Sequence, residues 1–126
     1  MEEQIKVLLV DDNDSIRELL RVEFSMDPRF KVVGEATDGR SALRAVELEK
    51  PDVVVLDLLM PQMDGFHAIS QIQFSSPETK ILVLTNADVD KLSLEYKGAH
   101  AVRTKEEVLD SWSVTQVAAS LCDTYN

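Results

Sequence analysis

Polar side chains follow four short apolar runs in this chain, each at the position where the run stops. Two carboxylates follow the first run and one follows a valine-rich run, while a hydroxyl and an amine close two later runs. A carboxylate can accept a phosphoryl group, and a hydroxyl and a lysine can bind the oxygens of that group. These residue types together predict a phosphoryl-transfer site. The residues concerned are Asp11, Asp12, Asp57, Thr85 and Lys105.

The three aspartates are expected to hold a metal ion. Neighbouring carboxylates repel one another, so such a cluster requires a divalent cation, a proton or a lysine. Mg²⁺ fits, because it takes oxygen ligands octahedrally and prefers one or two carboxylates together with waters and a phosphate oxygen. In this interpretation Asp57 is the nucleophile, Thr85 donates its hydroxyl to a phosphoryl oxygen, and Lys105 supplies positive charge opposite the metal.

Short β-rich runs that alternate with helical stretches must bring these residues together. Such an alternation predicts an α/β fold with a parallel sheet, whose ligand site lies at the carboxyl ends of the strands. We expect a doubly wound five-stranded parallel sheet in the order 2-1-3-4-5, the flavodoxin-like (βα)5 arrangement, with a crevice between strands 1 and 3. The expected strands are 5–10, 30–34, 52–57, 80–85 and a fifth that begins near residue 101.

Apolar spacing predicts the helices between these strands. Ile16, Leu20 and Phe24 share one helical face, and Asp38 is expected to cap the second helix. The third helix runs from a cap at Asp64 to just before residue 77, a weaker one spans about 87–96, and the last spans about 106–123. A carboxylate at a strand end can also cap the following helix, and this role remains open for Asp12 and Asp14.

Composition limits the class of protein. With 126 residues, 44% of them hydrophobic, we expect a single domain over residues 1–126. The net charge of −10 argues against direct nucleic-acid binding through this domain. The apolar runs are too short for a membrane span, the N-terminus is acidic, and the single cysteine, Cys122, suits a reducing compartment. A cytoplasmic protein without membrane contact is the expectation.

Four motifs surround the predicted site. They are Val10-Asp11-Asp12, the run Asp57-Leu58-Leu59-Met60-Pro61-Gln62-Met63-Asp64-Gly65, Leu84-Thr85, and Gly98-Ala99 leading to Lys105. In residue type and spacing this set resembles the CheY-like receiver domain of two-component response regulators, over essentially the entire chain. The resemblance therefore supports a single receiver domain.

The resemblance implies a role for each residue. Asp57 would accept a phosphoryl group from a histidine kinase or a phosphotransfer protein. The signal would leave through the face of the fourth helix, fifth strand and fifth helix, toward a downstream protein partner or an attached output domain, and this face could form a homodimer. Catalysis would be limited to slow self-phosphorylation and self-dephosphorylation. Mg²⁺ would be held by Asp11, Asp12, Asp57 and the backbone carbonyl of Leu59, and the phosphoryl group would contact Thr85 and Lys105.

Three positions depart from the family pattern. Val102 stands where the family usually has an aromatic residue that rotates inward together with the threonine, so the usual switch of Thr85 and this position cannot operate in that form. Glu106 replaces the proline that usually follows the lysine through a cis bond, and a trans bond is expected here. Asn86 is larger than the usual small residue and could alter access for a phosphodonor. Arg103 is an unusual residue for the output face.

Two other classes of function stay open. These departures favour a pseudo-receiver that acts as a binding or dimerisation scaffold without phosphorylation. A phosphoryl-transfer enzyme proper, such as an aspartyl-phosphate phosphatase, ranks last because the motif carries no second acid or base.

Overall fold

The sheet of this protein has the predicted order. A computed structural model describes residues 3–58, 65–85, 98–107 and 114–122. The strands run parallel in the order β2-β1-β3-β4-β5, which confirms the predicted topology. The described strands are β1 (Ile5–Val10), β2 (Phe30–Ala36), β3 (Val53–Leu56), β4 (Lys80–Thr85) and β5 (Ala101–Thr104).

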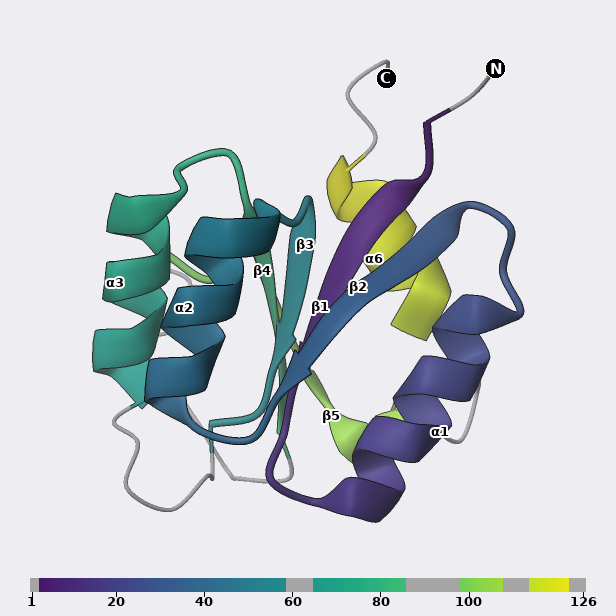
Figure 1. Cartoon of the computed structure of the whole chain (residues 1–126). Helices are drawn as coiled ribbons and strands as arrows, with labels where there is room; N and C mark the ends of the chain where they lie inside the picture. The colour runs from purple at the N-terminus through teal and green to yellow at the C-terminus, as the bar shows by residue number, and fades with distance from the viewer. Residues whose placement is uncertain (1–2, 59–64, 86–97, 108–113, 123–126) are drawn as a thin grey trace.

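Helices cover both faces of the sheet. In Figure 1, α2 and α3 lie on one side of the sheet, and α1 and α6 lie on the other. No helix within the described ranges is long and apolar enough to cross a membrane. The described helices are α1 (Asp14–Ser25), α2 (Gly39–Glu49), α3 (Gly65–Ser75) and α6 (Val114–Cys122).

The core forms two layers because side chains alternate along each strand. On β3, Val54 packs in the cluster under α2 and α3, whereas Val55 packs in the cluster under α1 and α6. Both side chains are buried, as are their neighbours on the strand. A strand that is apolar on both faces is typical of a central parallel strand. The valine-rich run therefore lies in the middle of the sheet, which puts the residue that follows it at the centre of one edge.

The start of α1 corrects one prediction. Neither Asp12 nor Asp14 caps this helix; the cap is Asn13, whose Oδ1 accepts a hydrogen bond from Ile16 N at 3.0 Å. Asn13 has the extended backbone of a cap residue, whereas Asp14 is already the first helical residue. The cap predicted for α2 is confirmed, since Asp38 Oδ1 accepts from Ser41 N at 2.8 Å.

Strand β2 is longer than predicted. It continues past Gly34 to Ala36, because the register against β1 shifts between Val7 and Leu8 and leaves one extra residue in β2. A bulge of this kind bends the strand without ending it, so Gly34, the last residue of the predicted strand, lies inside the observed one. The extension brings Glu35 and Ala36 alongside the last residues of β1.

Other boundaries differ less. Strand β3 is Val53–Leu56, shorter by one residue at each end than predicted, and α3 ends at Ser75, before Pro77 as expected. Gly98 has a φ of 119°, a positive value suited to glycine. The predicted cap Asp64 and the predicted helix over 87–96 lie outside the described residues. Of the predicted helix over 106–123, the structure describes helical residues up to Glu107 and then α6.

Candidate functional site

The ladder between β1 and β3 places two aspartates side by side. Val10 is paired with Leu56, and Asp57 N donates to Val10 O at 2.9 Å, so the hydrogen bonding continues one residue beyond the strand. On the other side of β1, Asp11 N donates to Ala36 O at 3.1 Å. Asp11 and Asp57 therefore follow adjacent central strands at the same edge of the sheet.

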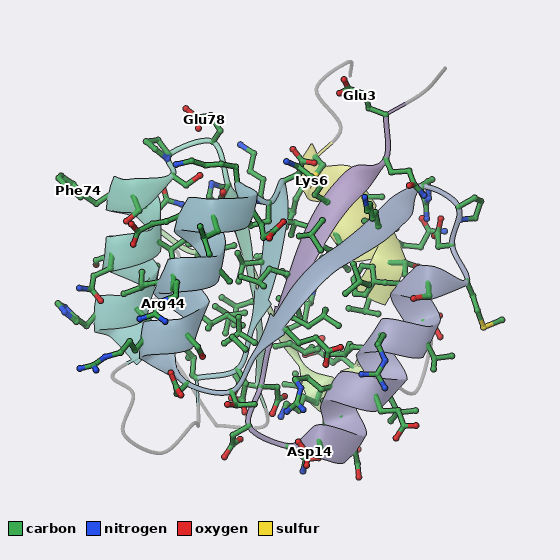
Figure 2. All side chains as sticks on the ribbon, viewed as in Figure 1. Glu3, Lys6, Asp14, Arg44, Phe74 and Glu78 are labelled. Atoms are coloured by element: carbon green, nitrogen blue, oxygen red, sulfur yellow. The ribbon has the colours of Figure 1, made fainter. Side chains whose placement is uncertain are left out.

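Asp11, Asp12 and Asp57 form a compact acidic cluster. One carboxylate oxygen from each lies within 4.8 Å of the others. Asp11 and Asp57 are buried and Asp12 is exposed, so the cluster has one side open to solvent. Figure 2 shows the end of the molecule where α1 begins at Asp14, opposite the end that carries Lys6. The cluster lies at the carboxyl ends of β1 and β3, as predicted.

Both oxygens of the Asp11 carboxylate are occupied. Oδ1 accepts from Asn13 N at 2.9 Å, and Oδ2 pairs with Lys105 Nζ at 2.9 Å. The same amine donates to Asp57 Oδ2 at 3.3 Å. Lys105 thus bridges the two buried carboxylates and supplies the positive charge that the sequence required of such a cluster.

Lys105 is held in its charged form. Burial by itself would lower the pKa of this amine, but hydrogen bonds and charge attraction from Asp11 and Asp57 outweigh it, and the pKa lies above its usual 10.5. The peptide bond that joins Lys105 to Glu106 is trans, as predicted, and the side chain still reaches both carboxylates.

A capping box fixes the backbone at this position. Thr104 Oγ1 accepts from Glu107 N, and Glu107 Oε1 accepts from Thr104 N, each at 3.0 Å. Reciprocal bonds of this kind define the first turn of a helix. Lys105 is therefore the first residue of that turn, directly after β5, and this backbone geometry aims its side chain without a proline.

The other predicted residues of β4 and β5 are also located. Thr85 is the last residue of β4, is buried, and is paired in register with Thr104. Val102 is 1% exposed and packs in the core cluster under α2 and α3. The Arg103 guanidinium folds back, and its Nη1 donates to Val102 O at 2.9 Å. Leu59 and Asn86 lie outside the described residues.

Two residues near the site were not predicted. Arg17 on α1 contacts the backbone of Asp11, and Glu35 on β2 pairs with Arg17. Helical spacing places Arg17 and Arg21 on one face of α1, and this face could have been recognised as charged. Its partner could not, because the bulge in β2 decides where Glu35 lies.

The donor set fits Mg²⁺. The cluster offers carboxylate oxygens only, with two buried ligands and one exposed ligand, and no sulfur or imidazole is part of it. Mg²⁺ prefers such hard oxygen donors and retains waters on its open side. A bound Mg²⁺ would be held by Asp11, Asp12 and Asp57.

Comparison with known proteins gives relatives over most of the chain. YhcZ, an uncharacterized transcriptional regulatory protein of Bacillus subtilis, is 44% identical over 82 residues, which are 65% of this chain and 38% of YhcZ. A protein-glutamate methylesterase/protein-glutamine glutaminase of Anaeromyxobacter dehalogenans is 39% identical over 97 residues, which are 77% of this chain and 28% of that enzyme. The chain thus matches less than half the length of either relative.

A solved structure and a family profile agree with these relatives. The signal receiver domain of the response regulator NarL from Mycobacterium tuberculosis superposes with a TM-score of 0.80 at 28% identity, over 94% of this chain and 98% of that domain. Residues 7–111 match the response regulator receiver domain. The matched region contains the acidic cluster, Thr85 and Lys105. The chain belongs to the response regulator receiver domain family.

Proposed function

We propose that this domain is phosphorylated on Asp57 with the help of Mg²⁺. Phosphorylation-dependent signalling is the general role of the receiver family. The observation that carries the proposal is the position of Lys105 Nζ, 2.9 Å from Asp11 Oδ2 and 3.3 Å from Asp57 Oδ2, within a cluster that also includes Asp12. These parts suit an aspartyl phosphoacceptor: a carboxylate serves as the nucleophile, and a metal ion and a lysine offset the charge of the phosphoryl group.

The transfer step is a displacement at phosphorus. A carboxylate oxygen of Asp57 forms the new P–O bond of an acyl phosphate. The bond from phosphorus to the donor breaks, either the P–N bond of a phosphohistidine or the P–O bond of acetyl phosphate, and its electron pair leaves with the donor. When bound, Mg²⁺ neutralises negative charge on the phosphoryl oxygens.

This chain's own residues support that step. Asp11, Asp12 and the backbone carbonyl of Leu59 are proposed as further metal ligands. Lys105 is close enough to Asp57 to form an ion pair with a phosphoryl oxygen, and Thr85 lies at the same edge of the sheet. After transfer, the new group adds about −1.5 to −2 charges at this edge.

The partners are proposed by class. A histidine kinase or a histidine phosphotransfer protein would donate the phosphoryl group in a cytoplasmic two-component system. The output would pass through the face that includes β5 to a downstream protein or an attached domain, or through a homodimer. The two relatives above, a transcriptional regulator and a methylesterase, support an attached output domain of variable kind. Residues 1–126 would form one receiver domain without its own nucleic-acid contact.

Intact mass tests the proposal. The chain is incubated with acetyl phosphate, with and without Mg²⁺, as wild type, Asp57→Asn, Asp12→Asn and Asp38→Asn. Asp38 is a matched control outside the cluster, and asparagine caps a helix as well as aspartate does. We expect a Mg²⁺-dependent phosphoryl adduct on the wild type and the control, none on Asp57→Asn, and a reduced yield on Asp12→Asn. An undiminished adduct on Asp57→Asn would show that the nucleophile lies elsewhere.

A second candidate is a pseudo-receiver that binds partners or dimerises without phosphorylation. It is favoured by Val102, which is an aliphatic side chain buried in the core where the family usually has a rotating aromatic. A folded wild-type chain that takes no adduct with Mg²⁺ present would favour this function. A change of partner affinity on adding acetyl phosphate would exclude it.

A further inference from the structure

Arg17 makes three polar contacts beside the acidic cluster. Its Nη1 donates to the backbone oxygen of Asp11 at 2.9 Å, its Nη2 pairs with Asp14 Oδ1 at 2.8 Å, and its Nε pairs with Glu35 Oε1 at 3.0 Å. The side chain is only 16% exposed. All three nitrogens of the guanidinium are therefore engaged, by a partner on its own helix, by the loop after β1 and by β2.

The hydrogen bond from Arg17 to Asp11 O restrains the peptide unit between Asp11 and Asp12, two of the proposed metal ligands. The carbonyl oxygen of Asp11 and the N–H of Asp12 belong to the same planar peptide unit. A hydrogen bond to that oxygen restricts rotation of this peptide plane. The orientation of the plane sets the position of the Asp12 Cα, from which the side chain extends. Asp11 itself is fixed on the other side by Asn13 N and by Lys105. Asp12 is exposed, so the backbone constraint matters most for this ligand.

The anchor of Arg17 is on the sheet. Glu35 lies in the part of β2 that follows the bulge, and it accepts from both Arg17 and Arg21. Burial would raise the pKa of Glu35, but the hydrogen bonds from Arg21 and Arg17 lower it below its usual 4.5, so the carboxylate stays charged at neutral pH. The guanidinium of Arg17 thus links β2 to the loop that carries Asp11 and Asp12.

We propose that Arg17 is a positioning residue for the magnesium site, acting through the Asp11–Asp12 peptide. The inference rests on the proposed function, because it requires that Asp11, Asp12 and Asp57 bind Mg²⁺. Mg²⁺ demands near-ideal octahedral geometry, and loss of a group that orients a ligand typically weakens metal binding about 10–100-fold.

A simple charge effect predicts the opposite sign. Arg17 carries a positive charge near the cluster, and removal of a like charge should tighten binding of a cation. Arg21 provides the matched control: it pairs with the same Glu35, through Oε2 at 2.9 Å, from a position one helical turn further along α1. The direction of the change therefore separates positioning from charge.

The experiment measures Mg²⁺ affinity of the whole, unphosphorylated chain by calorimetry with MgCl₂. The variants are Arg17→Gln, Arg17→Lys and Arg21→Gln, and urea unfolding of each without metal reports stability. We expect Kd to rise about 10–100-fold for Arg17→Gln and to change less than about twofold for Arg21→Gln. Arg17→Lys keeps the charge but cannot make all three contacts, so its Kd should lie between that of the wild type and that of Arg17→Gln.

An NMR measurement adds a readout that a change in stability alone would not alter. In metal-free chains, the backbone amide resonance of Asp12 should shift in Arg17→Gln and stay unchanged in Arg21→Gln. Unchanged or tighter Mg²⁺ binding by a folded Arg17→Gln chain would overturn the inference, as would affinities that simply follow the unfolding free energies. Absence of Mg²⁺ binding by the wild type would instead overturn the metal site of the proposed function, and this inference with it.

Discussion

Lys105 Nζ donates to Asp57 Oδ2 at 3.3 Å, so the lysine that follows β5 forms an ion pair with the carboxylate that follows β3. The strands that precede these residues are separated in the sheet by β4, and the long side chain of Lys105 spans the gap. Because Asp57 and Asp11 share this amine, its single positive charge partly offsets the negative charge of the two buried carboxylates.

Removal of this charge should tighten metal binding. We expect Lys105→Met to lower the Kd for Mg²⁺ about tenfold or more, because two unit charges at about 4 Å interact by about 1 kcal/mol even in bulk water, so that loss of repulsion from a doubly charged ion is worth about 2 kcal/mol. Calorimetry with MgCl₂ measures the effect, and Lys31→Met, at the other end of the sheet, is the control. The same variant should give less acetyl-phosphate adduct, since the phosphoryl group loses its cation. Equal Kd values for Lys105→Met and the wild type would contradict the role of Lys105 as an internal counter-ion.

An aromatic side chain should not fit at Val102. The valine is 1% exposed and packs with Ile69, Ile72 and Val83 in the described core. We expect Val102→Phe to lower the free energy of unfolding by about 1–3 kcal/mol, the usual cost of overpacking. Urea unfolding measures it, with Val22→Phe on the half-exposed face of α1 as the control, expected within about 0.5 kcal/mol of the wild type. An undiminished stability of Val102→Phe would mean that the core has room for the aromatic residue usual in the family.

The capping box at the end of β5 should couple Thr104 to Glu107. We expect Thr104→Ala to lower the free energy of unfolding by about 1 kcal/mol, because it leaves Glu107 N without its cap. Glu107→Ala should have a smaller effect in the Thr104→Ala background than in the wild type, since the two hydrogen bonds are reciprocal. A double-mutant cycle by urea unfolding measures the coupling, and Thr104→Ser should retain the cap. Strictly additive losses would argue against the box.

His100 should make the stability depend on pH. Its Nδ1 accepts from Ile81 N at 3.0 Å, so the neutral ring is required for this contact. Burial and the nearby charge of Lys80 lower the pKa of His100 below its usual 6.5. Because the folded-state pKa is depressed, the contribution of His100 is complete above the unfolded pKa and is lost as pH falls through the folded pKa.

Asparagine provides the control for this effect, because its Oδ1 can accept the same hydrogen bond without titrating. Between about pH 7.5 and about pH 5, the wild type should lose about 1 kcal/mol more stability than His100→Asn, the typical worth of one hydrogen bond. Urea unfolding at the two pH values measures the difference. If both chains lost the same amount, the pH dependence would have to come from other groups.

Much of the fold was predictable from the sequence because β1, β3 and β4 are short, largely apolar runs bounded by polar residues. Parallel strands buried on both faces are read directly as apolar runs, and Val53–Leu56 is the clearest case. The predictions that were wrong concern local details. The cap of α1 is Asn13 because three polar residues in succession compete for that position, and β2 passes Gly34 because a bulge depends on the neighbouring strand.

By itself, the sequence determined the alternation of strands and helices and, given the expected strand order, the meeting of Asp11, Asp12 and Asp57 at one edge, because residues that follow adjacent parallel strands must lie together. The tertiary structure decided how the site is held. The reach of Lys105 across β4 depends on sheet order and on the capping box after β5, and the contact of Arg17 with the Asp11 backbone depends on where the bulge in β2 places Glu35. The ion pairs of Lys105 with Asp11 and of Arg17 with Glu35 join segments far apart in the chain, and their geometry arises from register and packing, which no local pattern of residues encodes.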